Sequence, residues 1–145
     1  MKIVVQRVSK AQVHVHQELV VSIESGLLLL VCCEQGDDQG TIEKGAEKCI
    51  KLRIFEDDQQ KMNLSVTQVT GASILAVSQF TLAWNGEKGH RPSFDQAMAP
   101  AQARVLFRLF CDKLREHVHV ETGQFGASME VSLTNLGPVT FHLEF

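Results

Sequence analysis

Residues that interrupt regular structure are scarce in this sequence. Three prolines and ten glycines among 145 residues, with a hydrophobic content of 44%, exclude disordered, low-complexity and collagen-like chains. Long apolar runs are also missing, because the longest covers the seven residues 27–33, whereas a membrane-spanning helix needs about 20. The first residues contain no sustained apolar region and no small-residue cleavage site. We therefore expect neither membrane insertion nor secretion.

An excess of positive charge is missing as well. Fourteen lysines and arginines against 17 aspartates and glutamates leave a net charge of −3. The chain thus has no global positive field, and we do not expect it to bind DNA. The charge is uneven, however, with a net −4 over residues 34–60 and a net +3 over residues 83–115. Local contact with the phosphate chain of a nucleic acid is compatible with this distribution.

The four cysteines form no Cys-x-x-Cys pair, which argues against a zinc knuckle and against a thioredoxin-like redox pair. Cys32 and Cys33 are adjacent in an apolar run, and Cys49 and Cys111 lie among apolar residues at helical spacing. We expect all four to be small buried hydrophobic residues of a protein in the reducing cytoplasm. The sequence motifs of nucleotide hydrolases, dinucleotide-binding proteins, serine hydrolases and zinc proteases are also missing.

No repeat, linker or charge block divides the chain, so we expect one domain over residues 1–145. Apolar patterning predicts strands over residues 3–15, 19–23, 27–33, 52–55, 73–82, 129–133 and 139–145. Apolar residues at helical spacing predict two helices, one over residues 38–52 after Asp37 and Asp38 and one over residues 100–114 that begins at Pro100. Strands in runs indicate an α+β fold with a mainly antiparallel, barrel-like sheet and two α-helices.

Arg7 lies on the same face of the first predicted strand as Ile3, Val5 and Val13. A guanidinium on an apolar face needs carbonyl or carboxylate partners, because it remains charged. Arg7 can therefore either extend past the strand end to solvent or hold an irregular segment of backbone in place. The pattern alone leaves both interpretations open.

Two short segments bring hydrogen-bonding groups to the ends of predicted strands. In Ser78-Gln79-Phe80-Thr81-Leu82, a strand would direct Gln79 and Thr81 to one face and Ser78 to the other. Such a strand end can present chemistry to a cleft, or it can bond to neighbouring backbone. In Gly137-Pro138-Val139-Thr140, glycine and proline can leave carbonyl groups directed at a ligand, or they can form an ordinary turn.

Two further groups of residues are candidates for ligand binding. Lys88 and Arg91, in the basic loop of residues 87–94, can contact phosphate or lie in a solvated turn. The His-x-His pairs at residues 14–16 and 117–119 have a spacing suited to zinc, but no Asp, Glu or Cys completes an obvious site. A zinc-dependent hydrolase is therefore a minor alternative, and we expect no metal and no cofactor.

Together these segments resemble the D-aminoacyl-tRNA deacylase family of chiral-proofreading enzymes. The two signature motifs of that family correspond to residues 78–82 and 137–140. Supporting blocks follow in unbroken order along the chain: Gln6-Arg7-Val8, Leu52-Arg53-Ile54-Phe55, Lys61-Met62-Asn63 and Arg91-Pro92-Ser93-Phe94. The resemblance implies hydrolysis in the cytoplasm of the ester bond of D-aminoacyl-tRNA, and of achiral glycyl-tRNA mischarged on tRNA-Ala.

The family further implies a homodimer in which each subunit inserts a cis Gly137-Pro138 peptide into its partner's active site. The carbonyl groups of this peptide would capture the substrate's α-amino group, so that an L side chain clashes while glycine is accepted. The site residues implied by the resemblance fall into three sets: the catalytic residues Ser78, Gln79, Phe80 and Thr81; the chirality-selecting residues Gly137, Pro138, Val139 and Thr140, supported by Arg7; and the adenosine-pocket residues Phe125 and Met129.

Ester hydrolysis needs a nucleophile and stabilisation of the developing oxyanion, which backbone N–H groups beside Phe80 and Thr81 can supply. No histidine or lysine base stands beside Thr81 in the motif, and an unactivated hydroxyl is a poor nucleophile. We therefore favour a site that positions the ester, while water or the adjacent ribose 2′-hydroxyl does the chemical work. The alternative outside this class of enzyme is a catalytically silent tRNA-binding protein on the same scaffold.

Overall fold

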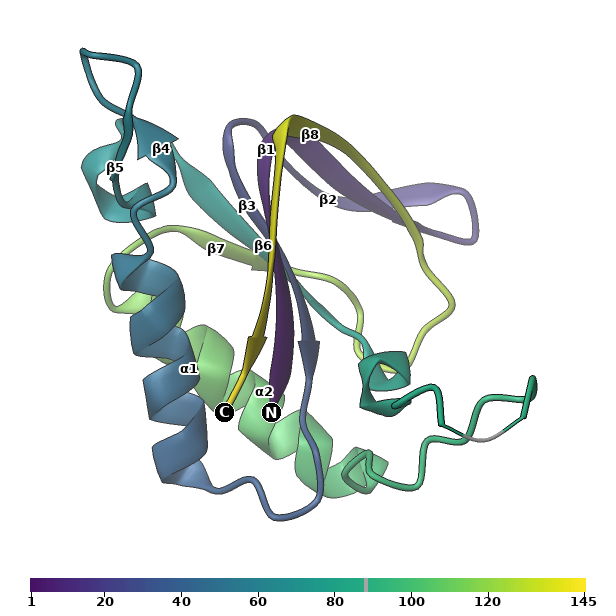
Figure 1. Cartoon of the computed structure of the whole chain (residues 1–145). Coiled ribbons are helices and arrows are strands. Elements are labelled where there is room, and N and C mark those ends of the chain that lie inside the picture. Colours follow the sequence, from purple (N-terminus) through teal and green to yellow (C-terminus); the bar gives the residue numbers. More distant parts are fainter. Residues whose placement is uncertain (88) are drawn as a thin grey trace.

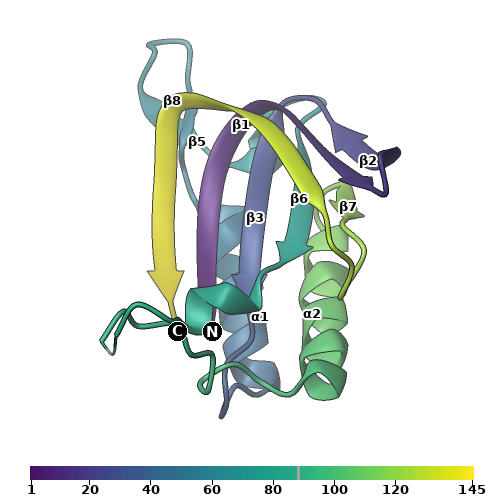
Figure 2. The same cartoon turned by 90° about the vertical axis from the view of Figure 1, so that its right-hand side faces the viewer.

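A curved sheet with two helices on one face makes up the fold (Figures 1 and 2). The computed structural model describes residues 1–87 and 89–145. Within these residues the elements, in chain order, are β1 (Lys2–Val15), β2 (Glu18–Ile23), β3 (Gly26–Cys32), α1 (Gln39–Lys51), β4 (Phe55–Glu56), β5 (Met62–Leu64), the 3₁₀ helix η1 (Val66–Gln68), β6 (Ser73–Ser78), the 3₁₀ helix η2 (Phe80–Ala83), α2 (Pro100–Arg115), β7 (Val120–Thr122) and β8 (Glu130–Glu144). The predicted α+β composition with two α-helices is confirmed.

The main sheet is mixed, so the prediction of a mainly antiparallel sheet was wrong. β1 pairs antiparallel with β2 and β3 along one edge and with β8 along the other. β6, however, pairs parallel with β3, and β7 pairs parallel with β6. These pairs are parallel because the chain crosses over through α1 after β3 and through α2 after β6, and then returns in the same direction. The sheet curves into a nearly closed, barrel-like shape, as predicted (Figure 2).

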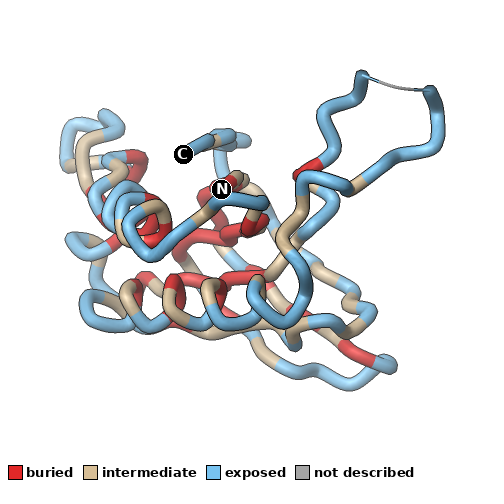
Figure 3. Tube along the Cα trace, turned by 90° about the horizontal axis from the view of Figure 1, so that it is seen from below, coloured by how far each residue is buried: buried red, intermediate tan, exposed pale blue. Residues whose placement is uncertain are grey.

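Two apolar cores lie on opposite faces of this sheet. The first packs β1 and β3 against the helices and includes Ile3, Leu29 and Phe110. The second lies within the curve of the sheet and includes Val8 and Leu75. Because β3 contributes to both cores, nearly all of its residues are buried, which agrees with its continuous apolar sequence. Buried residues follow the central strands and the inner faces of the helices (Figure 3).

The first helix begins and packs as its sequence suggests. The Asp38 carboxylate accepts a hydrogen bond of 2.8 Å from the backbone N–H of Thr41, and this bond lowers the pKa of the carboxyl group. Gly45 lies inside α1, where glycine costs about 1 kcal/mol relative to alanine. A Cβ at Gly45 would stand 2.9 Å from the sulfur of Met1, so the glycine lets the N-terminus pack closely. No helix in the described residues is long and apolar enough to cross a membrane.

Three predicted strand boundaries were wrong. Of the strand expected over residues 52–55, only Phe55 lies in a strand. That strand is β4, and β5 pairs with both of its residues, Phe55 and Glu56. The strand expected over residues 73–82 ends at Ser78, and the two expected over residues 129–133 and 139–145 form the single strand β8. The last two differences fall on the two signature segments and shape the candidate site.

Candidate active site

The first signature segment lies where two parallel strands end at the same edge of the sheet. β3 and β6 pair as far as Val31 and Ser78, and one further bond of 2.7 Å runs from the N–H of Gln79 to the carbonyl of Val31. The chain then leaves the sheet as η2. β6 stops there because β3 ends at Cys32 and offers no further ladder partner.

This turn brings Gln79 and Thr81 together. The side-chain amide of Gln79 donates a hydrogen bond of 2.6 Å to the hydroxyl oxygen of Thr81. The expected strand ends at Ser78, so Gln79 and Thr81 lie in the turn and not on a strand, and Ser78 and Gln79 both line one cavity. Thr81 is exposed and does not belong to the lining.

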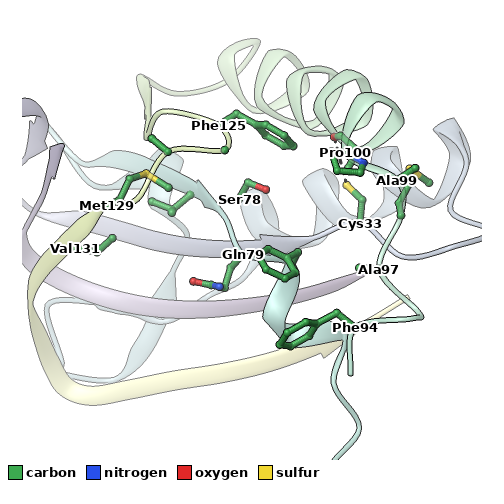
Figure 4. Close-up of a pocket in the computed structure, with 16 residues that line it drawn as sticks. Cys33, Ser78, Gln79, Phe94, Ala97, Ala99, Pro100, Phe125, Met129 and Val131 are labelled. Carbon is green, nitrogen blue, oxygen red and sulfur yellow. Dashed lines mark hydrogen bonds between the residues drawn. The ribbon is translucent and has the colours of Figure 1, made fainter. Parts of the chain in front are cut away.

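A cavity of about 600 Å³ opens beside the turn, a volume typical of small-molecule sites (Figure 4). Ser78, Gln79 and Phe80 form one side of it. Phe125 and Met129, from the segment between β7 and β8, form another side, and the start of α2 completes the wall. The predicted catalytic residues, apart from Thr81, and the predicted adenosine-pocket residues therefore share one cavity.

Several lining residues have no role that the sequence predicted. Phe94 stacks edge-on against Phe80, with ring centres 5.0 Å apart, and both rings line the cavity. Cys33 and Pro100 also contribute, from the end of β3 and the start of α2. The only sequence signal for Phe94 was its place in a family block, Arg91-Pro92-Ser93-Phe94. Cys33 and Pro100 were predicted to be a buried residue and a helix start, with no link to a site.

No charged side chain lines the cavity in the part of the chain that the structure describes. Burial raises the pKa of the Cys33 thiol to about 12, so this thiol is protonated near neutral pH and is not a nucleophile. The described lining also includes no imidazole or carboxylate that could act as a general base. The cavity can orient a substrate through apolar contacts and hydrogen bonds, rather than through charge.

The second signature segment forms a bulge in β8. Thr140 pairs with Gln6 and Asn135 pairs with Val8, so residues 136–139 have no ladder partner on β1. The Gly137–Pro138 peptide is cis, as the family resemblance implies. Because pairing with β1 continues on both sides of the bulge, the two predicted strands are one strand.

Arg7 stands opposite this bulge and is buried, with 8% of its surface exposed. Its guanidinium donates a hydrogen bond of 2.8 Å to the carbonyl of Ile54 and lies 3.5 Å from a carboxylate oxygen of Glu56. A Cβ on Gly137 would stand 3.3 Å from one of the guanidinium nitrogens. The sequence left two interpretations of Arg7 open. The structure agrees with the second, because Arg7 contacts the irregular backbone and does not extend to solvent.

The cavity and the bulge do not meet within one chain. None of residues 136–140 lines the cavity. In Figure 2 the bend of β8 lies at the top of the sheet, whereas η2 lies towards its lower end. The predicted chirality-selecting residues thus lie apart from the predicted catalytic and adenosine-pocket residues within this chain.

A family model described as D-Tyr-tRNA(Tyr) deacylase matches residues 4–144. The chain belongs to this family. It is 51% identical to the D-aminoacyl-tRNA deacylase of Haemophilus ducreyi, over 97% of this chain and 96% of that protein. It is 50% identical to the D-aminoacyl-tRNA deacylase of Lactobacillus gasseri, over 99% of both chains. The family expected from the sequence is confirmed, and the chain is an enzyme of the hydrolase class.

Two solved structures share the fold of this deacylase family member. One, named c-Myc DNA Unwinding Element Binding Protein, superposes with a TM-score of 0.93 at 39% identity and covers 100% of this chain and 99% of its own. The other, a probable eukaryotic D-amino acid tRNA deacylase, has a TM-score of 0.81 at 16% identity and covers 98% of both chains. At that lower identity the second structure shows the fold alone.

The remaining candidate residues lie outside the cavity. Lys88 falls outside the described residues, and Arg91 is exposed. Among residues 1–87 and 89–145, no group of three or more His, Cys, Asp or Glu side chains is arranged to hold a metal ion. His119 instead lies 2.9 Å from the carboxylate of Glu121, two residues along the chain.

Proposed function

We propose that this enzyme hydrolyses the ester bond of D-aminoacyl-tRNA and releases tRNA and the free D-amino acid. The observation that supports this most directly is the uncharged cavity between residues 78–80 and residues 125–129. Phe125 offers an aromatic face and Met129 a polarizable thioether, and both groups pack well against a purine base. With the terminal adenosine in that position, the ester on its ribose lies towards the turn that holds Gln79 and Thr81.

We also propose that the active form is a homodimer, in which the partner subunit's Gly137–Pro138 segment closes the cavity. Three observations support this arrangement: the segment is exposed, residues 136–139 have no ladder partner on β1, and none of them lines the cavity of its own chain. Phe80 beside the cavity is 56% exposed and Leu136 in the bulge is 40% exposed, and exposed apolar groups of this size favour an interface.

The proposed segment accounts for chiral selection. Carbonyl groups of the segment would bind the substrate's α-amino group, with Val139 and Thr140 shaping the loop and Arg7 holding it from behind. An L side chain would then meet the backbone of the loop, whereas a D side chain would point away from it. Glycine has no side chain to exclude, so glycyl-tRNA, including tRNA-Ala mischarged with glycine, is a second proposed substrate.

Positioning, rather than covalent catalysis, is the proposed source of the rate. Thr81 accepts a hydrogen bond from Gln79, and no general base lines the cavity in the described residues. The N–H groups of Phe80 and Thr81 stand at the first two positions of η2, where a helix has no internal acceptor for them. These groups are the proposed stabilisers of the oxyanion. Water attacks the ester carbonyl, the bond to the ribose O3′ breaks, and the neighbouring 2′-hydroxyl can pass a proton to the leaving O3′.

Replacing Thr81 by alanine separates the two mechanisms. If Thr81 only helps to position the ester, the variant is expected to fold normally and to keep its single-turnover rate on D-aminoacyl-tRNA within a factor of about ten. Loss of a covalent nucleophile would instead lower the rate by about 10⁴-fold or more. Circular dichroism checks the folding of the variant. A rate loss of that size in a folded variant would establish the covalent threonine.

A deacylation assay with D-aminoacyl-, L-aminoacyl- and glycyl-tRNA tests the proposed function. We expect the D-aminoacyl and glycyl esters to be cleaved and the L-aminoacyl ester to survive. Equal cleavage of D and L esters would contradict chiral selection, and binding of tRNA without any cleavage would favour the catalytically silent alternative. Loss of activity on addition of a chelator would favour the zinc-dependent alternative.

Because charged tRNA is used in the cytoplasm, we propose that compartment as the site of action.

A further inference from the structure

Arg104 lies near the start of α2, at the rim of the cavity. Its guanidinium carbon stands 4.9 Å from the centre of the Phe125 ring, in a cation–π contact. One guanidinium nitrogen lies 3.9 Å from the position that a Cβ on Gly126 would occupy. The cavity lining includes Phe125, Gly126 and Ala103, the residue before Arg104. Arg104 itself is exposed and does not line the cavity. Figure 4 shows Phe125 beside α2.

Arg104 differs from the other cations of α2, which all pair with carboxylates. Those pairs are Arg108 with Asp112, Arg115 with Asp112, and Lys113 with both Glu43 and Glu116. Over residues 1–87 and 89–145, Arg104 forms no such ion pair and makes its contact with an aromatic ring instead. A cation without an acidic partner is thus placed beside a cavity with an uncharged lining, where it is available to an anionic group of the ligand.

We propose that Arg104 forms a phosphate subsite, in which its guanidinium binds the 5′-phosphate of the nucleotide whose base packs against Phe125 and Met129. The identity of that nucleotide rests on the proposed function. In the full substrate the group is the phosphodiester that joins the terminal adenosine to the preceding nucleotide. A guanidinium suits this role because its planar fork offers two parallel N–H groups to phosphate oxygens, and the contact with Phe125 keeps the group at the rim of the cavity.

The chemistry of the cavity explains why this phosphate binds at the rim. The described lining holds no positive group, and burying an anion without a partner is costly. A nucleoside can enter the cavity, but its 5′-phosphate has to remain outside, next to the ribose. Arg104 is the cation in contact with Phe125, the aromatic residue proposed to hold the base. The subsite therefore fixes the direction in which the 3′ end enters.

Titration of the full-length protein with AMP and with adenosine tests the subsite directly. The unmodified protein is expected to bind AMP about tenfold more tightly than adenosine, as is usual for a hydrogen bond to a charged group. Arg104→Gln should reduce this preference to a factor of about two or less, while Arg104→Lys, which keeps the charge, should retain most of it. Arg108→Gln, one turn further along α2, is the matched control and should leave the preference unchanged.

Kinetics with D-aminoacyl-tRNA test the same residue in the complete reaction. Arg104→Gln is expected to raise KM about five- to tenfold with little change in kcat, because the contact is made before and during the reaction alike. The slope of log KM against log salt should fall by about 0.7, the value for one phosphate contact on a single strand. A residue that only supports Phe125 would change KM without changing that slope.

The outcomes separate the subsite from the proposed function. Equal affinity of the unmodified protein for AMP and adenosine, including no measurable binding of either, would overturn the subsite, as would an unchanged preference in Arg104→Gln. The AMP titration requires no ester cleavage. A protein that prefers AMP as expected but cleaves no D-aminoacyl-tRNA would contradict the proposed function and leave the phosphate subsite in place.

Discussion

Replacing Gly26 by alanine is expected to lower the free energy of unfolding by more than about 3 kcal/mol, because backbone already occupies the space for the new methyl group. A Cβ at Gly26 would lie 1.8 Å from the carbonyl oxygen of Ser73 and 2.8 Å from both the carbonyl carbon and the amide nitrogen of that residue. Gly26 and Ser73 are the first pair of the parallel β3–β6 ladder. The ladder has to open to admit the methyl group, and backbone hydrogen bonds and core packing are lost together. Urea denaturation measures the change.

Gly71→Ala is the matched control for this prediction. Gly71 also has a positive φ, of 75°, but no atom lies within 4 Å of the position of its Cβ. Its substitution should therefore cost only the strain of a left-handed backbone, about 1 kcal/mol. If Gly26→Ala is no more destabilising than Gly71→Ala, the close parallel pairing of β3 with β6 is contradicted.

Local patterns in the sequence were sufficient to predict most elements of the fold. Alternation over residues 3–15 predicted β1, and helical spacing after the capping candidates Asp37 and Asp38 predicted α1 within a residue at either end. These patterns succeed because each element buries one face, and the period of burial is recorded in its own residues. Pro100 predicted the first residue of α2 for a similar reason, since its fixed φ and missing N–H suit that position.

Features that depend on residues distant in the sequence could not be predicted in this way. The residues of β6 are equally compatible with parallel and antiparallel pairing, and the crossover through α1 decides between them. β6 ends at Ser78 because β3 ends, although the apolar pattern continues to Leu82. In the same way, β8 remains one strand through the bulge at Gly137 because β1 supplies partners on both sides of it.

The candidate site was predicted in part. Resemblance to a known family identified Gln79, Phe80, Phe125 and Met129, which the structure places around one cavity. It did not identify Arg104, because in the sequence this arginine is one of several polar residues on the exposed face of an amphipathic helix. The contact of Arg104 with Phe125 arises from the packing of α2 against the segment that follows β7. Side chains that act by lying beside a ligand pocket are found only when the tertiary structure is known.

Replacing Gly137 by alanine is expected to lower the rate of D-aminoacyl-tRNA deacylation by about 100-fold, since misplacement of a positioning group by about 1 Å can have an effect of this size. A Cβ at Gly137 would stand 2.7 Å from Cγ2 of Val139 and 2.9 Å from the N–H nitrogen of Val139. It would also stand 3.3 Å from the guanidinium of Arg7, and the φ of 115° disfavours any side chain. The bulge has to shift to admit the methyl group, and Arg7, which contacts Gly137, restricts that shift. Single-turnover assays with D- and L-aminoacyl-tRNA measure the rate and the selectivity.

Gly36→Ala controls for backbone strain in this experiment. Gly36 has a φ of 90°, with no atom within 4 Å of its Cβ position, and it does not line the cavity. Both variants are expected to lose about 1–3 kcal/mol of stability through the disfavoured backbone conformation, and only Gly137→Ala is expected to lose activity. If Gly137→Ala cleaves D-aminoacyl-tRNA at the normal rate and still spares the L ester, the bulge of one subunit does not form part of the active site of its partner. If the two variants lose activity equally, the loss follows from strain alone and the assignment of Gly137 to chiral selection is wrong.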